Sequence, residues 1–508
     1  MTDVIGLIAA LLLPALLGQA MLRALRLRPA TLWFAAWVWP LGALTTALIT
    51  FGWMVSGLDA SNGLQAGAVA GLWLGLEVFL RGRRSREEGR GEATRSGAKV
   101  WARRLALAVL LGLAFFPATD AMLSQWGRPV FQDDDASIWT FKARILQEHG
   151  RIDDGLSAKL REDITGAHHL DYPLFNPLCQ VWIMGLAGTE SDWAVRVPDW
   201  MFLIALILLG FACCGDGRRS GLGWIVALSV ATAPALFLPG TGTKSDHWVA
   251  FGLLGVLGAL ERLRREEQGA GLILTAGALV LVWGKNEGLM LALCVVAAGL
   301  LLHGRRSFRW VRERPGLLLV VVATGTLVAA QIAFNRFYHL ENDILSGGAG
   351  KDARPVFRML IENLPERAGT IGRAFWLHIL DQRDIPVAQD FTALKPSNHG
   401  LYALLLGLIL LFPRRIWKTS AAWPALTAIL GLAGFFLAYA VSFEGRTPEG
   451  LRWHLYTSSS RVLLQILPCM AFAASRLLGE LPLFWNSGAA APNGDRESTG
   501  PTEDEETP

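Results

Sequence analysis

The amino-acid sequence predicts an all-α polytopic membrane protein, a bundle of about 13 transmembrane helices with amphipathic helices on its outer surface. Of the 508 residues, 52% are hydrophobic and only 18% are charged, whereas a soluble domain usually carries about 25% charged residues. The apolar residues form long blocks, and 20 Trp against 5 Tyr fits the preference of Trp for the membrane–water interface. This pattern excludes a soluble enzyme and a disordered regulator, and a net charge of +4 excludes a nucleic-acid binder.

The apolar blocks have the length of membrane spans. A spanning helix needs about 20 mostly apolar residues, with a range of about 17–25. The first block is not a cleaved signal peptide by its sequence, because Met1-Thr2-Asp3 lacks the basic start of one. The thirteen predicted spans, of which 269–284 and 399–413 are short, are 4–22, 31–56, 63–80, 105–122, 193–214, 221–239, 245–262, 269–284, 286–303, 317–337, 399–413, 420–442 and 460–478.

The orientation follows from the basic loops, because Lys and Arg are enriched on the cytoplasmic side. The 81–104 loop alone holds nine basic residues. With thirteen alternating crossings all basic loops lie on one face, so we expect the N-terminus outside and the C-terminus in the cytoplasm. The other basic loops contain Arg23 to Arg28, Arg218 and Arg219, Arg262 to Arg265, Arg305 to Arg314, and Arg414 to Lys418.

The segments between the spans also carry structural signals. Residues 173–189 are apolar, but a fourteenth crossing there would reverse every later loop, so we expect an interfacial or re-entrant helix on the outer face. Residues 134–151 have the spacing of an amphipathic surface helix. Together with 338–398, the stretch 123–192 forms the large outer loops. The acidic tail from about 479 is predicted to be disordered.

Three adjacent carboxylates, Asp133, Asp134 and Asp135, follow the fourth span at the outer interface. Their mutual repulsion next to a low-dielectric region tends to raise the pKa of at least one of them. Such a group suits a general base or a site for Mg²⁺ or Mn²⁺. The alternative is an N-cap cluster for the helix that follows.

Other ionisable residues stand at span ends on the same predicted face. Asp246 opens one predicted span, and its alternative role is to cap that helix. Lys285 and Glu287 lie in the predicted outer turn of a hairpin, and their alternative role is to neutralise each other in that turn. Ionisable groups at membrane depth are candidates for function by default. The remaining candidates, with a solvated loop or a snorkelling anchor as their alternatives, are His168, His169, Asp171, Arg446, Arg452, His454 and Arg461.

These groups combine acids with Lys and Arg on one face of the membrane. We expect them to converge on one cavity from at least four outer segments. Such a set suits a reaction with a base at one end and an anionic leaving group, such as a phosphate, at the other.

Six sequence segments together carry a family resemblance. They are DDDASIWTFKARIL at 133–146, HLDYPLFNPLCQVWIMGLAG at 169–188, AVRVP at 194–198, KSD at 244–246, WGKNEG at 283–288 and SRVLLQILP at 460–468. In this order the chain resembles the C-type (GT-C) membrane glycosyltransferase superfamily, polytopic enzymes that take sugars from polyprenyl-phosphate carriers. Protein O-mannosyltransferases and the lipid A aminoarabinose transferase belong to it.

The resemblance implies a role for each candidate residue in an inverting sugar transfer. Asp134, favoured by the register of the following Ser137 over Asp133 and Asp135, would activate the acceptor hydroxyl. No cofactor is implied, although a divalent cation at the triplet stays open. The donor phosphate would be held by Lys285, Arg461, Arg452 and Glu287, and the acceptor side or second acid site would be formed by Asp246, His169 and Asp171.

The resemblance also implies a domain organisation and a location. Residues 1–104 would be three added N-terminal spans with a basic loop, 105–478 a GT-C-like catalytic module, and 479–508 a cytoplasmic tail. The expected partners are a polyprenyl-phosphate sugar, a glycan, lipid or protein acceptor, and membrane lipids, in a bacterial inner membrane. The alternatives are a transporter or flippase of lipid-linked sugars, for which repeated halves are expected but not found in the sequence, and a non-catalytic scaffold.

Overall fold

The computed structural model describes most of the chain in segments. The described residues are 2–27, 31–57, 62–84, 98–130, 135–162, 169–216, 220–237, 242–304, 312–340, 356–380, 384–388, 391–394, 398, 400–442 and 447–480.

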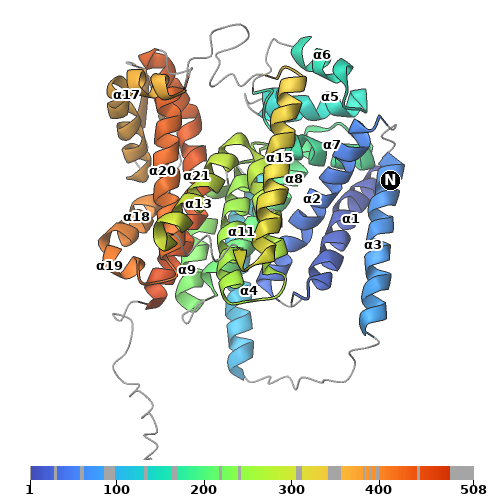
Figure 1. The fold of residues 1–508 in the computed structure, drawn as a ribbon, viewed down its shortest axis with the longest axis horizontal. Helices are drawn as coiled ribbons and strands as arrows, with labels where there is room; N and C mark the ends of the chain where they lie inside the picture. Colours follow the sequence, from blue (N-terminus) through green and yellow to red (C-terminus); the bar gives the residue numbers. More distant parts are fainter. Residues whose placement is uncertain are drawn as a thin grey trace, which may run out of the picture.

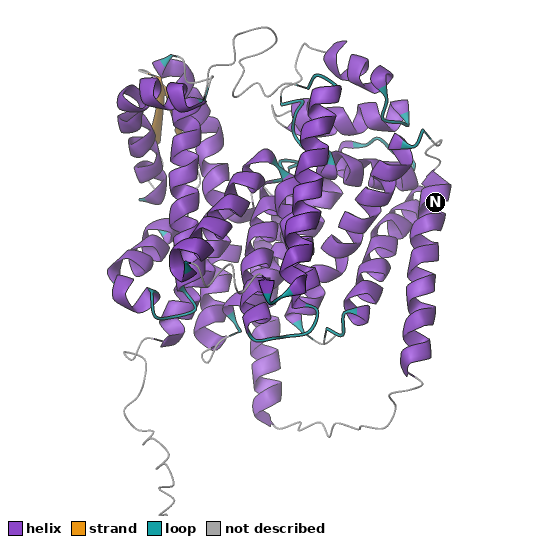
Figure 2. Ribbon diagram, viewed as in Figure 1, coloured by secondary structure: helices purple, strands orange, loops and turns teal. Residues whose placement is uncertain are grey.

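Within these segments the chain is almost entirely helical (Figure 2). The exception is one antiparallel hairpin of β1 (Asp384–Ala388) and β2 (Phe391–Leu394), which the all-α prediction did not include. The helices are α1 (Thr2–Ala24), α2 (Leu32–Val55), α3 (Asn62–Arg84), α4 (Ala98–Trp126), η1 (Asp135–Thr140), α5 (Phe141–His149), α6 (Asp154–Glu162), α7 (Phe175–Ala187), α8 (Asp192–Cys214), α9 (Ser220–Ala231), α10 (Pro234–Phe237), α11 (Asp246–Arg264), α12 (Ala270–Gly284), α13 (Asn286–His303), α15 (Pro315–Phe337), α17 (Val356–Ile379), α18 (Leu401–Leu411), α19 (Pro413–Ile416), α20 (Ala422–Val441) and α21 (Pro448–Glu480).

Many of the helices have the length and composition of membrane spans. Among the described residues, nine helices are long and apolar enough to cross a membrane, namely α1 to α4, α8, α13, α15, α20 and α21. The prediction of a helical polytopic membrane protein is confirmed in this form. In the described parts of the four other predicted spans, α9, α12 and α18 are too short to qualify and α11 is too charged. For example, the 15 residues of α12 rise only about 22 Å, against a hydrocarbon core of about 30 Å.

The bundle has two chemically different ends (Figure 1). The start of α1 lies at the end that carries α5, α6 and α7, whereas α19 and the end of α21 lie at the opposite end. At that opposite end the basic turns are joined by ion pairs, since Arg265 contacts Asp216 at 2.7 Å and Arg314 contacts Glu266 at 3.2 Å. We call this the basic end, and the other the α5–α6 end. The sidedness of the whole set of basic loops, and the orientation of the termini that follows from it, stay predictions.

Helix α7 corrects one prediction. A helix lying along the membrane surface should expose one face, but all of its 13 residues except Gly185 and Leu186 are buried. The indole of Trp182 donates to the Ala10 carbonyl of α1 at 2.9 Å, and the ring of Phe175 stacks on Trp283 at 5.1 Å. This burial overturns the interfacial form of the prediction, whereas the re-entrant form stays a prediction. Helix α7 is mostly apolar, and its Asn176 and Gln180 side chains are buried with hydrogen-bond partners, so it packs inside the bundle.

An aromatic layer packs α7, α8, α11 and α12 together. Phe202 stacks on Trp248 with ring centroids 4.0 Å apart, and Phe175 meets Trp248 edge-on at 4.7 Å. Such pairs contribute about 0.5–1.5 kcal/mol each beyond the burial of their area. Because Trp248 and Trp283 each lie two residues from an ionisable group, the layer forms a rigid base under the charged residues described next.

Candidate functional site

A buried ion cluster lies where α11, α12, α13 and α21 meet. Lys285, in the extended turn between α12 and α13, is 4% exposed. Its ammonium group contacts Asp246 Oδ1 at 3.0 Å and Glu287 Oε1 at 3.1 Å. Gln465 of α21 donates to the same Asp246 oxygen at 2.7 Å, and the Tyr172 hydroxyl donates to Glu287 Oε1 at 3.4 Å. We call these five residues the Lys285 cluster.

The two carboxylates of the Lys285 cluster have unused hydrogen-bonding capacity. Asp246 Oδ2 and Glu287 Oε2 are buried and have no hydrogen-bond partner among the described residues. An unsatisfied buried acceptor costs about 1–3 kcal/mol. The Arg461 guanidinium lies within electrostatic range of Asp246, so two cations balance two anions here. The carboxylates can therefore accept hydrogen bonds from hydroxyl groups, while Lys285 and Arg461 attract an anion.

A second buried network fixes the position of Asp246. The preceding residue, Ser245, adopts a left-handed backbone conformation with φ of 57°. Asp199 of α8 accepts hydrogen bonds from the Ser245 amide at 3.3 Å and from the Trp248 indole at 2.8 Å. Asn176 of α7 donates to the Ser245 hydroxyl at 2.6 Å. These contacts hold the strained turn at the head of α11, and so aim Asp246 at Lys285.

Tyr172 is held against the Lys285 cluster by the segment that precedes α7. Its ring is stacked on His169 with centroids 4.7 Å apart, and the Lys285 ammonium lies 5.7 Å from the ring centroid. The fully buried Lys142 of α5 donates to the carbonyls of His169 at 2.7 Å and of Tyr172 at 3.2 Å. The amphipathic helix α5 therefore anchors the 169–172 turn over the cluster.

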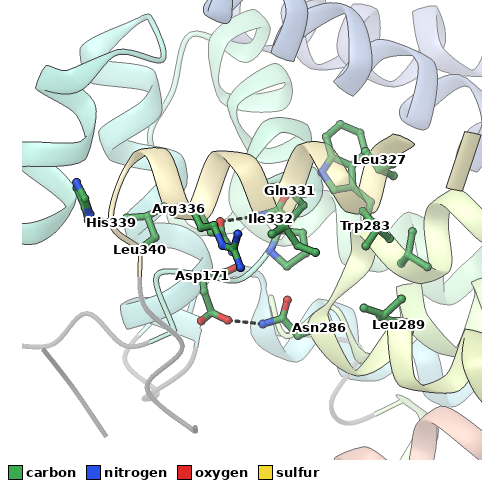
Figure 3. A pocket seen from close by; sticks show the side chains of 14 residues that line it. Asp171, Trp283, Asn286, Leu289, Leu327, Gln331, Ile332, Arg336, His339 and Leu340 are labelled. Atoms are coloured by element: carbon green, nitrogen blue, oxygen red, sulfur yellow. Dashed lines mark hydrogen bonds between the residues drawn. The ribbon is translucent and has the colours of Figure 1, made fainter. Parts of the chain in front are cut away.

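Asp171 links the cluster to α15 (Figure 3). The Asn286 amide donates to Asp171 Oδ2 at 2.5 Å, and the Asn335 amide of α15 donates to the Asp171 carbonyl at 2.9 Å. Beside these residues lies a cavity of about 660 Å³. Asp171 is thus at the edge of an open site, whereas Asp246 lies inside the bundle.

The structure brings together six of the predicted site residues: Asp246, Lys285, Glu287, Asp171, His169 and, by charge, Arg461. Asp133 and Asp134 lie outside the described residues, as do His168 and Arg446. Only the backbone of Asp135 is described, as the first residue of the π-helix η1. The predicted base and the cation site at the triplet therefore stay predictions.

Arg452 is not brought into the cluster. Its side chain is exposed, and nine residues of α21, about 13 Å of helix rise, separate it from Arg461. His454 instead hydrogen-bonds the Ser442 hydroxyl at 3.0 Å. In the part of the chain that the structure describes, no group of three or more His, Cys, Asp or Glu side chains is placed to hold a metal ion.

Sequence reasoning missed several residues of the site. Asp199 carried a signal, since it is an ionisable residue inside the apolar run of α8, and such residues are functional candidates. Gln465 and Asn176 gave a weaker one, as amides within apolar helices that need buried partners. Tyr172 gave none, because nothing in its local sequence shows which way the ring turns.

A comparison with protein-family models, with curated proteins and with solved structures gave no match for this chain.

Proposed function

We propose that this chain is an integral-membrane glycosyltransferase. It moves a sugar from a polyprenyl-phosphate carrier to an envelope acceptor, at the outer, periplasmic face of a bacterial inner membrane, with inversion at the anomeric carbon. The observation that carries the proposal is the Lys285 cluster, in which carboxylate oxygens with free capacity lie buried beside Lys285 and Arg461. The sequence resemblance supplies the reaction class.

The cluster suits the two ends of a sugar phosphate. Carboxylates accept hydrogen bonds from sugar hydroxyls, and Asp246 Oδ2 and Glu287 Oε2 have the capacity for them. Guanidinium and ammonium groups stabilise the charge of a departing phosphate, which is the largest electrostatic requirement of the transfer. As a phosphate draws Lys285 and Arg461 towards itself, sugar hydroxyls take over as donors to the two acids.

The proposed reaction is a single displacement. The acceptor hydroxyl oxygen forms a bond to the anomeric carbon as the bond from that carbon to the phosphate oxygen breaks. The hydroxyl proton passes to the Asp134 carboxylate, and polyprenyl phosphate leaves as the anion. Assistance by a general base contributes about 10²–10⁴-fold.

The test uses purified protein in proteoliposomes with a polyprenyl-phosphate-linked sugar. We expect release of polyprenyl phosphate, with most activity lost in Glu287→Gln, which keeps the Lys285–Asp246 pair, and in Asp134→Asn. The matched controls are Glu148→Gln and Asp192→Asn, whose carboxylates lie at the same end of the bundle in exposed or half-exposed ion pairs with Lys159 and Arg144.

Two results would contradict the proposal. One is full activity of a normally folded Asp134→Asn or Glu287→Gln protein. The other is movement of the intact labelled donor across the membrane without cleavage, which would favour the transporter alternative.

A further inference from the structure

A groove opens beside the Lys285 cluster, between α15 and the hairpin of α12 and α13 (Figure 3). Its volume of about 660 Å³ is within the range of about 300–1,000 Å³ that is typical of small-molecule sites. Asp171, Pro173 and Asn286 form the wall towards the cluster. The groove is therefore large enough for a ligand and adjoins the buried charges.

The lining changes from apolar to polar along the groove. On α15, Leu327 and Val328 come first. Gln331, Asn335 and Arg336 follow towards the end of the helix, with the apolar Ile332 among them. The α12–α13 wall matches them, since Val282, Trp283 and Leu289 provide apolar surface and Asn286 provides an amide. A ligand that fills the groove must have one apolar and one polar end.

The polar end of the groove carries an exposed arginine. Arg336 and His339 line it, and both side chains are exposed. The acid there, Asp171, is 3% exposed and accepts the Asn286 amide on Oδ2, so the charged group that a ligand in the groove meets is Arg336. Guanidinium groups bind phosphate with two parallel hydrogen bonds, so charge complementarity favours an anionic head.

The groove opens towards the bilayer. Helix α15 is a candidate span of which only 6% is buried, and it packs mainly on α12. Its apolar side chains are exposed along its length, for example Leu318 and Val322 at 59% and 56%. A ligand in the membrane can therefore reach the groove from the side.

We propose that this groove is a lateral binding site for an anionic phospholipid of the surrounding membrane. The phosphate contacts Arg336 and His339, and the hydrocarbon chain lies along Leu327, Val328 and Leu289. The proposal goes beyond the proposed function, because lipid binding here can be measured whether or not the protein transfers sugar.

The test is lipid selectivity in reconstituted, full-length protein. Spin-labelled phosphatidic acid or spin-labelled phosphatidylcholine is added in trace amounts to phosphatidylcholine bilayers, and electron spin resonance gives the fraction of restricted label. We expect phosphatidic acid to bind preferentially. Arg336→Gln should lower its relative association constant roughly tenfold, as loss of a charged hydrogen bond implies, and Arg373→Gln, an exposed arginine of α17, should leave it unchanged.

A second pair of variants tests the location. Val328→Trp fills the groove, whereas Val322→Trp adds the same bulk to an exposed position of α15 that does not line it. We expect only Val328→Trp to abolish the selective fraction. Equal binding of the two labelled lipids by the wild-type protein would overturn the proposal, as would the same result for the two tryptophan variants or for the two arginine variants.

Discussion

Two groups of charged residues join helices at opposite ends of the bundle, and they differ in how completely their acids are paired. At the basic end, Asp216, Glu261 and Glu267 each contact at least two arginines, from among Arg262, Arg264, Arg265 and Arg476. We call these seven residues the Asp216 network. Most of its side chains are 16–46% exposed. The Lys285 cluster has two acids for one lysine at its centre. The side chains of Lys285 and Asp246 are 5% and 0% exposed, and that of Glu287 is 22% exposed.

This difference is our reason for proposing a functional site at the Lys285 cluster and a structural role for the Asp216 network. The Asp216 network has four arginines for three acids, which keeps that end basic. Water screens the charges that the ion pairs do not neutralise. In the Lys285 cluster, two carboxylate oxygens are buried without a partner among the described residues. Retaining such groups is costly in a folded protein. The Asp216 network has one such atom among the described residues, Arg476 Nε, against two carboxylate acceptors in the cluster, so the cluster is the stronger indication of a site.

The largest expected effect comes from removing the cation of each group. Lys285→Met leaves Asp246 charged and buried and Glu287 charged and half-buried, so we expect a loss of roughly 3–5 kcal/mol of stability. Arg265→Met breaks pairs that are partly in water, and should cost no more than about 1 kcal/mol. Thermal unfolding in detergent, followed by loss of the monodisperse protein, measures both; similar losses would remove the contrast between the two ends.

A smaller effect is expected from the network that positions Asp246. Asp199→Asn can keep Oδ1 as the acceptor for Ser245 and Trp248. It replaces Oδ2, which accepts from the Asn176 amide at 3.3 Å, by an amide group that faces that donor, so about 1–3 kcal/mol should be lost. Asp192→Asn is the matched control, because Asp192 pairs with the exposed Arg144 at the same end of the bundle. Greater destabilisation by the control would show that burial does not set the difference.

The smallest effect concerns an exposed pair at the α5–α6 end. The hydrogen bond with His149, at 2.6 Å, holds the pKa of Asp153 below its ordinary value of 3.8. A depressed carboxyl pKa stabilises the fold above the pKa of the unfolded state, and this contribution is lost as the pH falls through the folded value. The wild-type protein should therefore lose a small amount of stability as the pH falls below about 4, and Asp153→Asn should make this loss smaller. Unfolding measured across that pH range checks both expectations. An unchanged acid profile would contradict this role for Asp153.

The sequence predicted the convergence of charges better than their pairing. Alternating spans place the head of α11 and the α12–α13 turn at the same end, so Asp246 and Lys285 could be expected near one another. The role of Gln465 could not, because it depends on how α21 is rotated about its own axis. The burial of 173–189 in the bundle could not be predicted either, because an apolar stretch of this length is compatible with both an interface and a bundle interior.

The length of α21 gives the depth of Arg461, the arginine beside the Lys285 cluster. The helix has 33 residues, which corresponds to about 50 Å and exceeds the hydrocarbon core of about 30 Å. From Glu480 at the basic end to Arg461 the rise is about 28 Å, or one hydrocarbon thickness. If the basic end marks one surface of the membrane, Arg461 stands at the level of the headgroups of the opposite leaflet. A lipid phosphate in that leaflet would meet this guanidinium without leaving its own layer.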